Sequence, residues 1–183
     1  MDELRMFKQF ISSAEHVWTQ IASSPMGKTV YTVNGVDYTP LPEKYNSKRK
    51  ISRIFRRYWG KQLTEAMIRN LQLRSLKGKL CVPYGVIPPF PTTVQSVQVR
   101  ASLPNQRVVQ AILIGKGKKI TVDYRLIKTG NATSFTIMKR SGRQLDQRYR
   151  PARPVAAPPK PFINPKAAPQ AKPRGKKKLL KTP

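Results

Sequence analysis

The chain has 183 residues, and 39% of them are hydrophobic, which is enough to form the core of one domain of ordinary size. It carries 36 Lys and Arg against 8 Asp and Glu, a formal net charge of +28 with a pI near 11.0. Such charge attracts polyanions, so nucleic acid, an anionic membrane surface and the anionic polymers of a bacterial cell wall are all candidate partners. The single cysteine, Cys81, excludes an internal disulfide, and the sequence lacks the run of about 18 apolar residues that spans a membrane.

The first expected element is an amphipathic helix over residues 3–22. Its apolar residues recur at intervals of three and four, and they are Met6, Phe7, Phe10, Ile11, Ala14, Val17, Trp18 and Ile21. Ser23-Ser24-Pro25 ends the helix. The only histidine, His16, lies at the rim of this stripe. We expect it to be a partly buried structural residue, because its only local carboxylate, Glu15, does not face it.

A β-hairpin is expected next, with strands over residues 29–33 and 36–38. The turn between them is Asn34-Gly35, a pair that tolerates the positive φ angles of a tight hairpin turn. The sequence therefore places a small β element directly after the first helix.

Two short helices are expected after Pro42. Asn46-Ser47 caps the first of them and Gly60 ends it, and its apolar positions are Ile51, Ile54, Phe55, Tyr58 and Trp59. The opposite face of that helix is strongly basic. Thr64 caps the next helix, which continues through Ala66, Met67, Ile68 and Leu71.

The remaining pattern has a period of two residues and predicts three or four consecutive antiparallel strands. The apolar positions are Val97, Val99 and Ala101; Val109, Ala111 and Leu113; Ile120, Val122, Tyr124 and Leu126; Phe135 and Ile137. Turn residues separate them at Pro104-Asn105, Gly115-Lys116-Gly117 and Thr129-Gly130-Asn131. The expected fold class is α+β, with N-terminal amphipathic helices packed on one face of an antiparallel sheet.

Composition changes sharply near residue 150. Residues 151–183 hold 9 of the 17 prolines and 9 Lys and Arg, with no acidic residue and very few β-branched or aromatic residues. Such a segment buries too little apolar surface to offset its ordering entropy. We therefore expect a single α+β domain over residues 1–148 and a disordered, Pro/Lys-rich cationic tail over residues 149–183.

No pattern of catalytic residues is found. The eight acidic residues are scattered among cations and are expected to form surface ion pairs, and no Cys/His dyad, metal-spaced cluster or phosphate-binding loop occurs. We expect no catalytic, cofactor-binding or metal-binding residues, and hence a binding protein rather than an enzyme. Asn131-Ala132-Thr133 matches the glycosylation sequon, which we interpret as coincidence because residues 1–5 do not resemble a signal peptide.

Polyanion binding is assigned instead to two clusters of cations. On the basic helix they are Lys48, Arg49, Lys50, Arg53, Arg56, Arg57 and Lys61, and in the tail they are Lys172, Arg174, Lys176, Lys177, Lys178 and Lys181. Such a helix can lie along a phosphate backbone. It can equally be a solvated face whose aromatic residues belong to the core, and the tail cluster can be merely solubilising.

The order of elements resembles the IseA-type inhibitors of bacterial DL-endopeptidases over roughly residues 5–140. The resemblance rests on the initial helix, on Tyr31-Thr-Val-Asn-Gly35-Val-Asp-Tyr38 followed by Leu41-Pro42, on Ser47-Lys-Arg-Lys50 with Tyr58, on Leu63-Thr64, on Gly78-Lys79-Leu80-Cys-Val-Pro83, and on the closing antiparallel sheet. It implies a non-enzymatic, cystatin-like or NTF2-like α+β protein. Such a protein docks on the cleft of an NlpC/P60-type cell-wall peptidase and blocks its catalytic cysteine.

Three functions remain open from the sequence. The leading one is a monomeric peptidase inhibitor, secreted or associated with the cell wall, whose tail binds teichoic acid or a similar anionic polymer. The alternative is a cytoplasmic nucleic-acid-associated protein of the ribosomal or virion-packaging type, which binds the phosphate backbone through the basic helix and the tail. The third is a lipid-carrying or small-ligand module, which requires a deep apolar pocket between sheet and helices.

Overall fold

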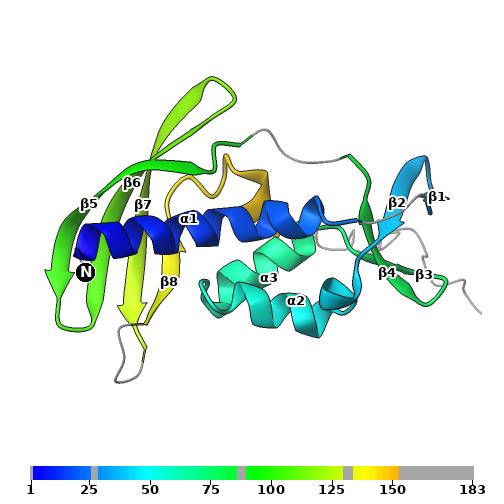
Figure 1. Cartoon of the computed structure of the whole chain (residues 1–183), viewed down its shortest axis with the longest axis horizontal. Helices are drawn as coiled ribbons and strands as arrows, with labels where there is room; N and C mark the ends of the chain where they lie inside the picture. Colours follow the sequence, from blue (N-terminus) through cyan, green and yellow to red (C-terminus); the bar gives the residue numbers. More distant parts are fainter. Residues whose placement is uncertain (1, 26–28, 86–89, 130–133, 153–183) are drawn as a thin grey trace, which may run out of the picture. The chain divides into compact units, whose positions relative to one another are not determined.

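In a computed structural model, which describes residues 2–25, 29–85, 90–129 and 134–152, the N-terminal helix α1 spans Glu3–Ala22 (Figure 1). This confirms the sequence prediction. Asp2 caps the helix, because its side chain accepts a hydrogen bond from the Leu4 amide. One face of α1 is buried, and the other is exposed and polar.

A four-stranded antiparallel sheet, here called the meander sheet, packs against α1 (Figure 1). Its strands are β5 (Thr93–Leu103), β6 (Gln106–Gly115), β7 (Lys118–Lys128) and β8 (Phe135–Arg140), and they pair in chain order. The period-two prediction is thus confirmed. Val109, Val122 and Leu126 point into the core, and Phe7 of α1 makes an edge contact with Phe135 of β8 at 5.3 Å between ring centroids.

A second antiparallel sheet, here called the small sheet, is made of strands ordered β1-β2-β4-β3. These are β1 (Tyr31–Val33), β2 (Val36–Pro40), β3 (Arg74–Leu76) and β4 (Lys79–Pro83). The predicted hairpin is the β1–β2 pair, and its turn has positive φ angles at Asn34 (51°) and Gly35 (75°). The β3–β4 hairpin, absent from the sequence prediction, turns in the same way at Lys77 (47°) and Gly78 (73°).

Three shorter elements separate the two hairpins of the small sheet. They are the 3₁₀ helix η1 (Glu43–Tyr45), α2 (Lys48–Phe55) and α3 (Lys61–Asn70). Ser47 caps α2, as predicted, by accepting a hydrogen bond from the Lys50 amide.

Helix α2 ends earlier than the sequence predicts. The backbone after it pairs with β8: the Ile137 amide donates to the Tyr58 carbonyl at 2.8 Å, and the Gly60 amide donates to the Ile137 carbonyl at 2.9 Å. Residues 56–58 form a turn in place of the further helical turn that the apolar pattern indicates, and these bonds then hold Trp59 and Gly60 against β8.

The predicted cap of α3 at Thr64 is also wrong. Gly60 occupies the cap position, and Thr64 lies inside the first turn, where its hydroxyl donates to the Trp59 carbonyl. A Thr that bonds back to a carbonyl four or five residues earlier is compatible with a helix interior, and the sequence alone does not separate the two roles.

One hydrophobic core joins α1, α2, α3, the meander sheet and part of the small sheet. It is closed by the 3₁₀ helix η2 (Gln147–Tyr149), whose Tyr149 is fully buried. The carbonyl of Arg150 accepts a hydrogen bond from Asn70 of α3, so ordered contacts continue at least that far. Most of the predicted tail and the sequon at Asn131 lie outside the described residues.

Candidate functional site

The cationic face of α2 is built by the short helix Lys48–Phe55 and the turn after it. Ile51 and Phe55 are fully buried and Ile54 is partly buried against the core, so the basic residues of the helix point to solvent. The seven cations assigned from the sequence are all exposed: Lys48, Arg49, Lys50, Arg53, Arg56, Arg57 and Lys61. All seven side chains are thus accessible to solvent around the exposed part of α2 and the turn after it, with Lys48 beside α3 and Arg57 beside α1.

These cations are not neutralised by neighbouring carboxylates. None of the ion pairs found within the described residues includes a cation of this face. Lys50 bonds only to a backbone carbonyl, that of Glu43, at 2.9 Å. The face therefore keeps its full positive charge for an external anion.

The aromatic residues behind the cations belong to the core. Phe55 and Trp59 are fully buried, and Tyr58 packs against Phe10 with ring centroids 5.6 Å apart. Base reading from a single strand needs exposed aromatic faces on which bases stack. The α2 face offers charge without such faces, so it provides no surface on which bases stack. The tail cations from Lys172 to Lys181 lie outside the described residues.

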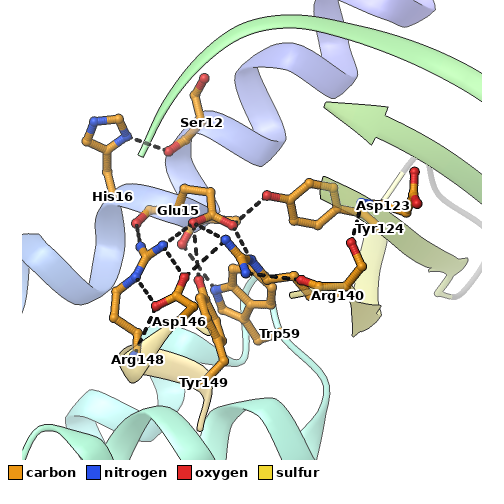
Figure 2. Close-up of polar contacts among 12 residues, drawn as sticks. Ser12, Glu15, His16, Trp59, Asp123, Tyr124, Arg140, Asp146, Arg148 and Tyr149 are labelled. Carbon is orange, nitrogen blue, oxygen red and sulfur yellow. Dashed lines mark hydrogen bonds and ion pairs between the residues drawn. The ribbon is translucent and has the colours of Figure 1, made fainter. Parts of the chain in front are cut away.

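A second charged cluster is buried between α1, β8 and η2, and the sequence analysis did not identify it (Figure 2). Arg140 Nε donates to Glu15 Oε1, and Arg148 Nη2 donates to Glu15 Oε2, both at 2.7 Å. Asp146 Oδ2 lies 2.8 Å from Arg148 Nη2 and 3.1 Å from Arg140 Nη2. Two carboxylates and two guanidinium groups thus balance in charge.

Hydrogen bonds complete this buried cluster. Tyr124 of β7 donates to Glu15 Oε1 at 2.6 Å, and Arg148 Nη1 donates to the Glu15 carbonyl at 2.8 Å. Trp59, beside the cluster, donates from its indole nitrogen to the Ala14 carbonyl at 3.2 Å. Buried charges are tolerated when they are paired and fully hydrogen-bonded, and this cluster meets that condition.

The cluster shifts the pKa values of its members. Burial by itself raises the pKa of Glu15, but attraction to Arg140 and Arg148 and hydrogen bonds from Arg140 and Tyr124 outweigh it and lower that pKa to about 2. Burial and the neighbouring Glu15 charge raise the pKa of Tyr124 and that of Tyr149. Glu15 is therefore ionised, and both tyrosines are neutral, at neutral pH.

This cluster is a structural element and not an active site, because its charged side chains are at most 1% exposed and no substrate reaches them. The expectation that the acids form surface ion pairs is therefore wrong for Glu15 and Asp146. A signal for Glu15 was present in the sequence: it lies within the apolar stripe of α1, four residues after Ile11. No comparable signal exists for Asp146, which follows a turn after β8.

The other two candidate reactive residues take structural positions. His16 is exposed, which corrects the expectation of partial burial, because it faces away from the meander sheet; its Nδ1 lies 2.8 Å from the Ser12 carbonyl (Figure 2). Cys81 is buried in β4, as predicted, and burial raises the pKa of its thiol. Neither residue is paired with a partner for nucleophilic chemistry among the described residues.

The α1 helix, at 20 residues, is long enough to cross a bilayer but carries too many polar side chains, and no described helix qualifies as a membrane span. Within the described ranges no group of three or more His, Cys, Asp or Glu side chains is placed to hold a metal ion.

Comparison with known families gives one match. The family model described as IseA DL-endopeptidase inhibitor matches residues 3–97, more than half of the chain. The matched range runs from α1 through the small sheet and the α2 cationic face into β5. It is shorter than the resemblance drawn from the sequence, which extended to residue 140. No curated protein matches the chain.

Proposed function

The chain belongs to the IseA DL-endopeptidase inhibitor family, and we propose that it inhibits a cell-wall DL-endopeptidase of the NlpC/P60 type by docking on the peptidase cleft and covering its catalytic cysteine. The family match over residues 3–97 carries this proposal. In this proposal the chain acts by binding alone and performs no catalysis.

The folded part supplies a rigid body for such docking. A single hydrophobic core and the buried Glu15 cluster tie α1, β8 and η2 together, so the surface elements between them are held in fixed positions. Inhibitors that bind without large rearrangement lose little conformational entropy on association. We place the docking surface within the family-matched residues.

The charge of the chain gives the second part of the proposal. The α2 cationic face and the tail hold the inhibitor on an anionic wall polymer such as teichoic acid, which places it outside the cell beside its target. Exposed cations without internal partners support this attachment, because release of condensed counterions from a polyanion favours binding.

Nucleic acid is the alternative polyanion, and the burial of Phe55 and Trp59 weighs against a single-stranded partner, since the α2 face then lacks stacking surfaces for bases. The small-ligand function receives less support. Buried side chains from α1 and the meander sheet, among them Ile11, Leu113 and Tyr124, fill the space where its apolar pocket is required.

Protection of the catalytic cysteine tests the docking mode. A purified NlpC/P60 DL-endopeptidase is treated with an alkylating reagent in the presence and absence of the full chain. Docking over the cleft predicts that one equivalent of the chain slows alkylation of that cysteine, while a surface cysteine introduced far from the cleft reacts at an unchanged rate. If the peptidase is fully inhibited while its catalytic cysteine is alkylated at the unprotected rate, the chain acts elsewhere on the peptidase.

A further inference from the structure

A groove of about 800 Å³ separates α1 from the η1–α2 segment. Its α1 wall presents Ser12, His16, Thr19 and Ser23, which are spaced by three or four residues and so lie along one face. Its other wall presents Lys44 and Arg57. The distance along α1 from the first of these residues to the last is about 16 Å at the helical rise per residue, so the groove suits a chain segment better than a single small anion.

The groove is cationic and contains no acidic lining residue. Glu15 of the same helix is fully buried beneath this surface, and Arg140 and Arg148 neutralise it there (Figure 2). Arg57 is exposed and belongs to none of the ion pairs within the described residues. The field in the groove therefore favours a negatively charged ligand.

The α1 wall adds hydrogen-bonding groups to this field. Nδ1 of His16 donates to the Ser12 carbonyl at 2.8 Å, because a carbonyl only accepts. The His16 Nε2 atom has no partner among the described residues. The Ser23 hydroxyl donates to the Thr19 carbonyl at 2.7 Å and keeps its lone pairs for an external donor. A ligand that carries hydroxyl groups matches this wall.

The lining of this groove offers no open aromatic face on which a flat ligand can stack. Tyr45 is buried, and the Lys44 ammonium lies 4.8 Å from its ring centroid, while Tyr58 packs against Phe10. Nucleic-acid bases need an open aromatic face for stacking. The groove thus combines cations for phosphates with small polar groups for hydroxyls, and it lacks a stacking platform.

We propose that this groove binds a polyol-phosphate chain, in which hydroxylated carbon units alternate with phosphodiesters. Lys44 and Arg57 bind the phosphates, and the hydroxyl-bearing side chains of α1 bind the polyol. The inference rests on the wall-polymer part of the proposed function and adds a defined site and a ligand class to it.

The test measures the affinity of the full chain for a poly(glycerol phosphate) oligomer at about 150 mM salt, where general charge attraction is damped. Arg56→Gln and Arg57→Gln each remove one exposed charge at consecutive positions, but only Arg57 lines the groove. We expect Arg57→Gln to weaken binding about tenfold, as the loss of a charge-assisted hydrogen bond does, and Arg56→Gln about twofold. Equal losses in the two variants overturn the groove site.

Recognition of the polyol is tested with Thr19→Val, which removes a hydroxyl and leaves the charge unchanged. We expect this variant to bind the glycerol-phosphate oligomer about threefold to tenfold more weakly, as the loss of one hydrogen bond does. Its affinity for inorganic polyphosphate, which has no polyol, should be unchanged. Equal effects on both polymers, or no effect on either, overturn the ligand assignment. All three variants must keep the unfolding midpoint of the parent chain.

Two further measurements separate the possible failures. Single-stranded DNA with the same number of phosphates must bind more weakly than the oligomer, and equal affinity with equal sensitivity to Arg57→Gln makes the groove a nucleic-acid site and overturns the proposal. Peptidase inhibition is measured on the same preparations. Inhibition without oligomer binding contradicts only the groove site, whereas oligomer binding without inhibition contradicts the inhibitor function.

Discussion

Glu15 and Arg148 are 133 residues apart in the chain, and a contact of 2.7 Å joins the Glu15 Oε2 and Arg148 Nη2 atoms in the interior. The pair links η2, near the last of the described residues, to the middle of α1. Because Arg140 of β8 binds the other oxygen of the same carboxylate, one side chain connects three elements (Figure 2). The stability of the fold should therefore depend strongly on Glu15.

Replacement Glu15→Gln leaves two buried guanidinium groups facing a single carboxylate, that of Asp146. Breaking a buried ion pair from one side costs about 3–5 kcal/mol. We expect a loss of that size in the free energy of unfolding, measured by denaturant titration. Glu3→Gln is the control, since Glu3 pairs with Arg107 at the surface, and it should cost less than about 1 kcal/mol. Similar costs for the two variants would show that the buried cluster is not stabilising.

Acid should lower the free energy of unfolding by protonating the same carboxyl group. The pKa of Glu15 is about 2 in the folded state, against 4.5 for an unperturbed carboxyl. Between these values the unfolded state binds more protons, so stability rises with pH there. The contribution of Glu15 is complete above about pH 4.5 and is lost as the pH falls toward 2.

The measurement is the free energy of unfolding between pH 2 and 6, for the parent and for Glu15→Gln. The gap between them should be widest at the neutral end and shrink with acid. A gap of constant width would mean that Glu15 titrates normally in the folded state.

The α2 face should set the salt dependence of wall binding. We expect the variant in which Gln replaces Lys48, Arg49, Arg53 and Arg56 to show a shallower decrease of wall affinity with salt concentration. The reason is that fewer polymer counterions are released on binding. The matched control replaces Lys118, Lys119, Arg125 and Lys139, four exposed cations of the meander sheet. Sedimentation with isolated walls at increasing salt gives the slopes. Equal slopes for the two quadruple variants would mean that net charge alone, and not this face, holds the polymer.

Truncation after Ala152 separates the tail from inhibition. The described core and the Glu15 cluster lie within residues 2–152, so the shortened chain should keep its unfolding midpoint and its inhibitory potency. It should also dissociate from isolated cell walls at a lower salt concentration than the full chain does, because nine cations are removed. Wall retention that is equal at every ionic strength would exclude the tail as a tether.

Sequence patterns predicted the elements whose signals are local. The helical period of α1, the Asn34-Gly35 turn and the alternation in the meander sheet depend on neighbouring residues, and all three are confirmed. The early end of α2 depends on hydrogen bonds to Ile137, a residue far along the chain, and no local pattern contains that information.

The candidate site shows the same division. Exposure of the α2 cations follows from the position of Ile51 and Phe55 on the helix, so it was predictable. The buried cluster was not, since it depends on which distant cations meet Glu15. Composition alone cannot distinguish Arg140 and Arg148, which are buried, from the many exposed arginines of a chain with 36 basic residues.

The most direct test of the central claim is peptidoglycan hydrolysis by a purified NlpC/P60 DL-endopeptidase, titrated with the full chain at about 150 mM salt. A cationic polymer of equal charge serves as the control for nonspecific attraction to the substrate. We expect hydrolysis to stop near one equivalent of the chain and to continue with the control polymer. Undiminished hydrolysis, with nuclease-sensitive material bound to the purified chain, would contradict it and favour nucleic acid as the partner.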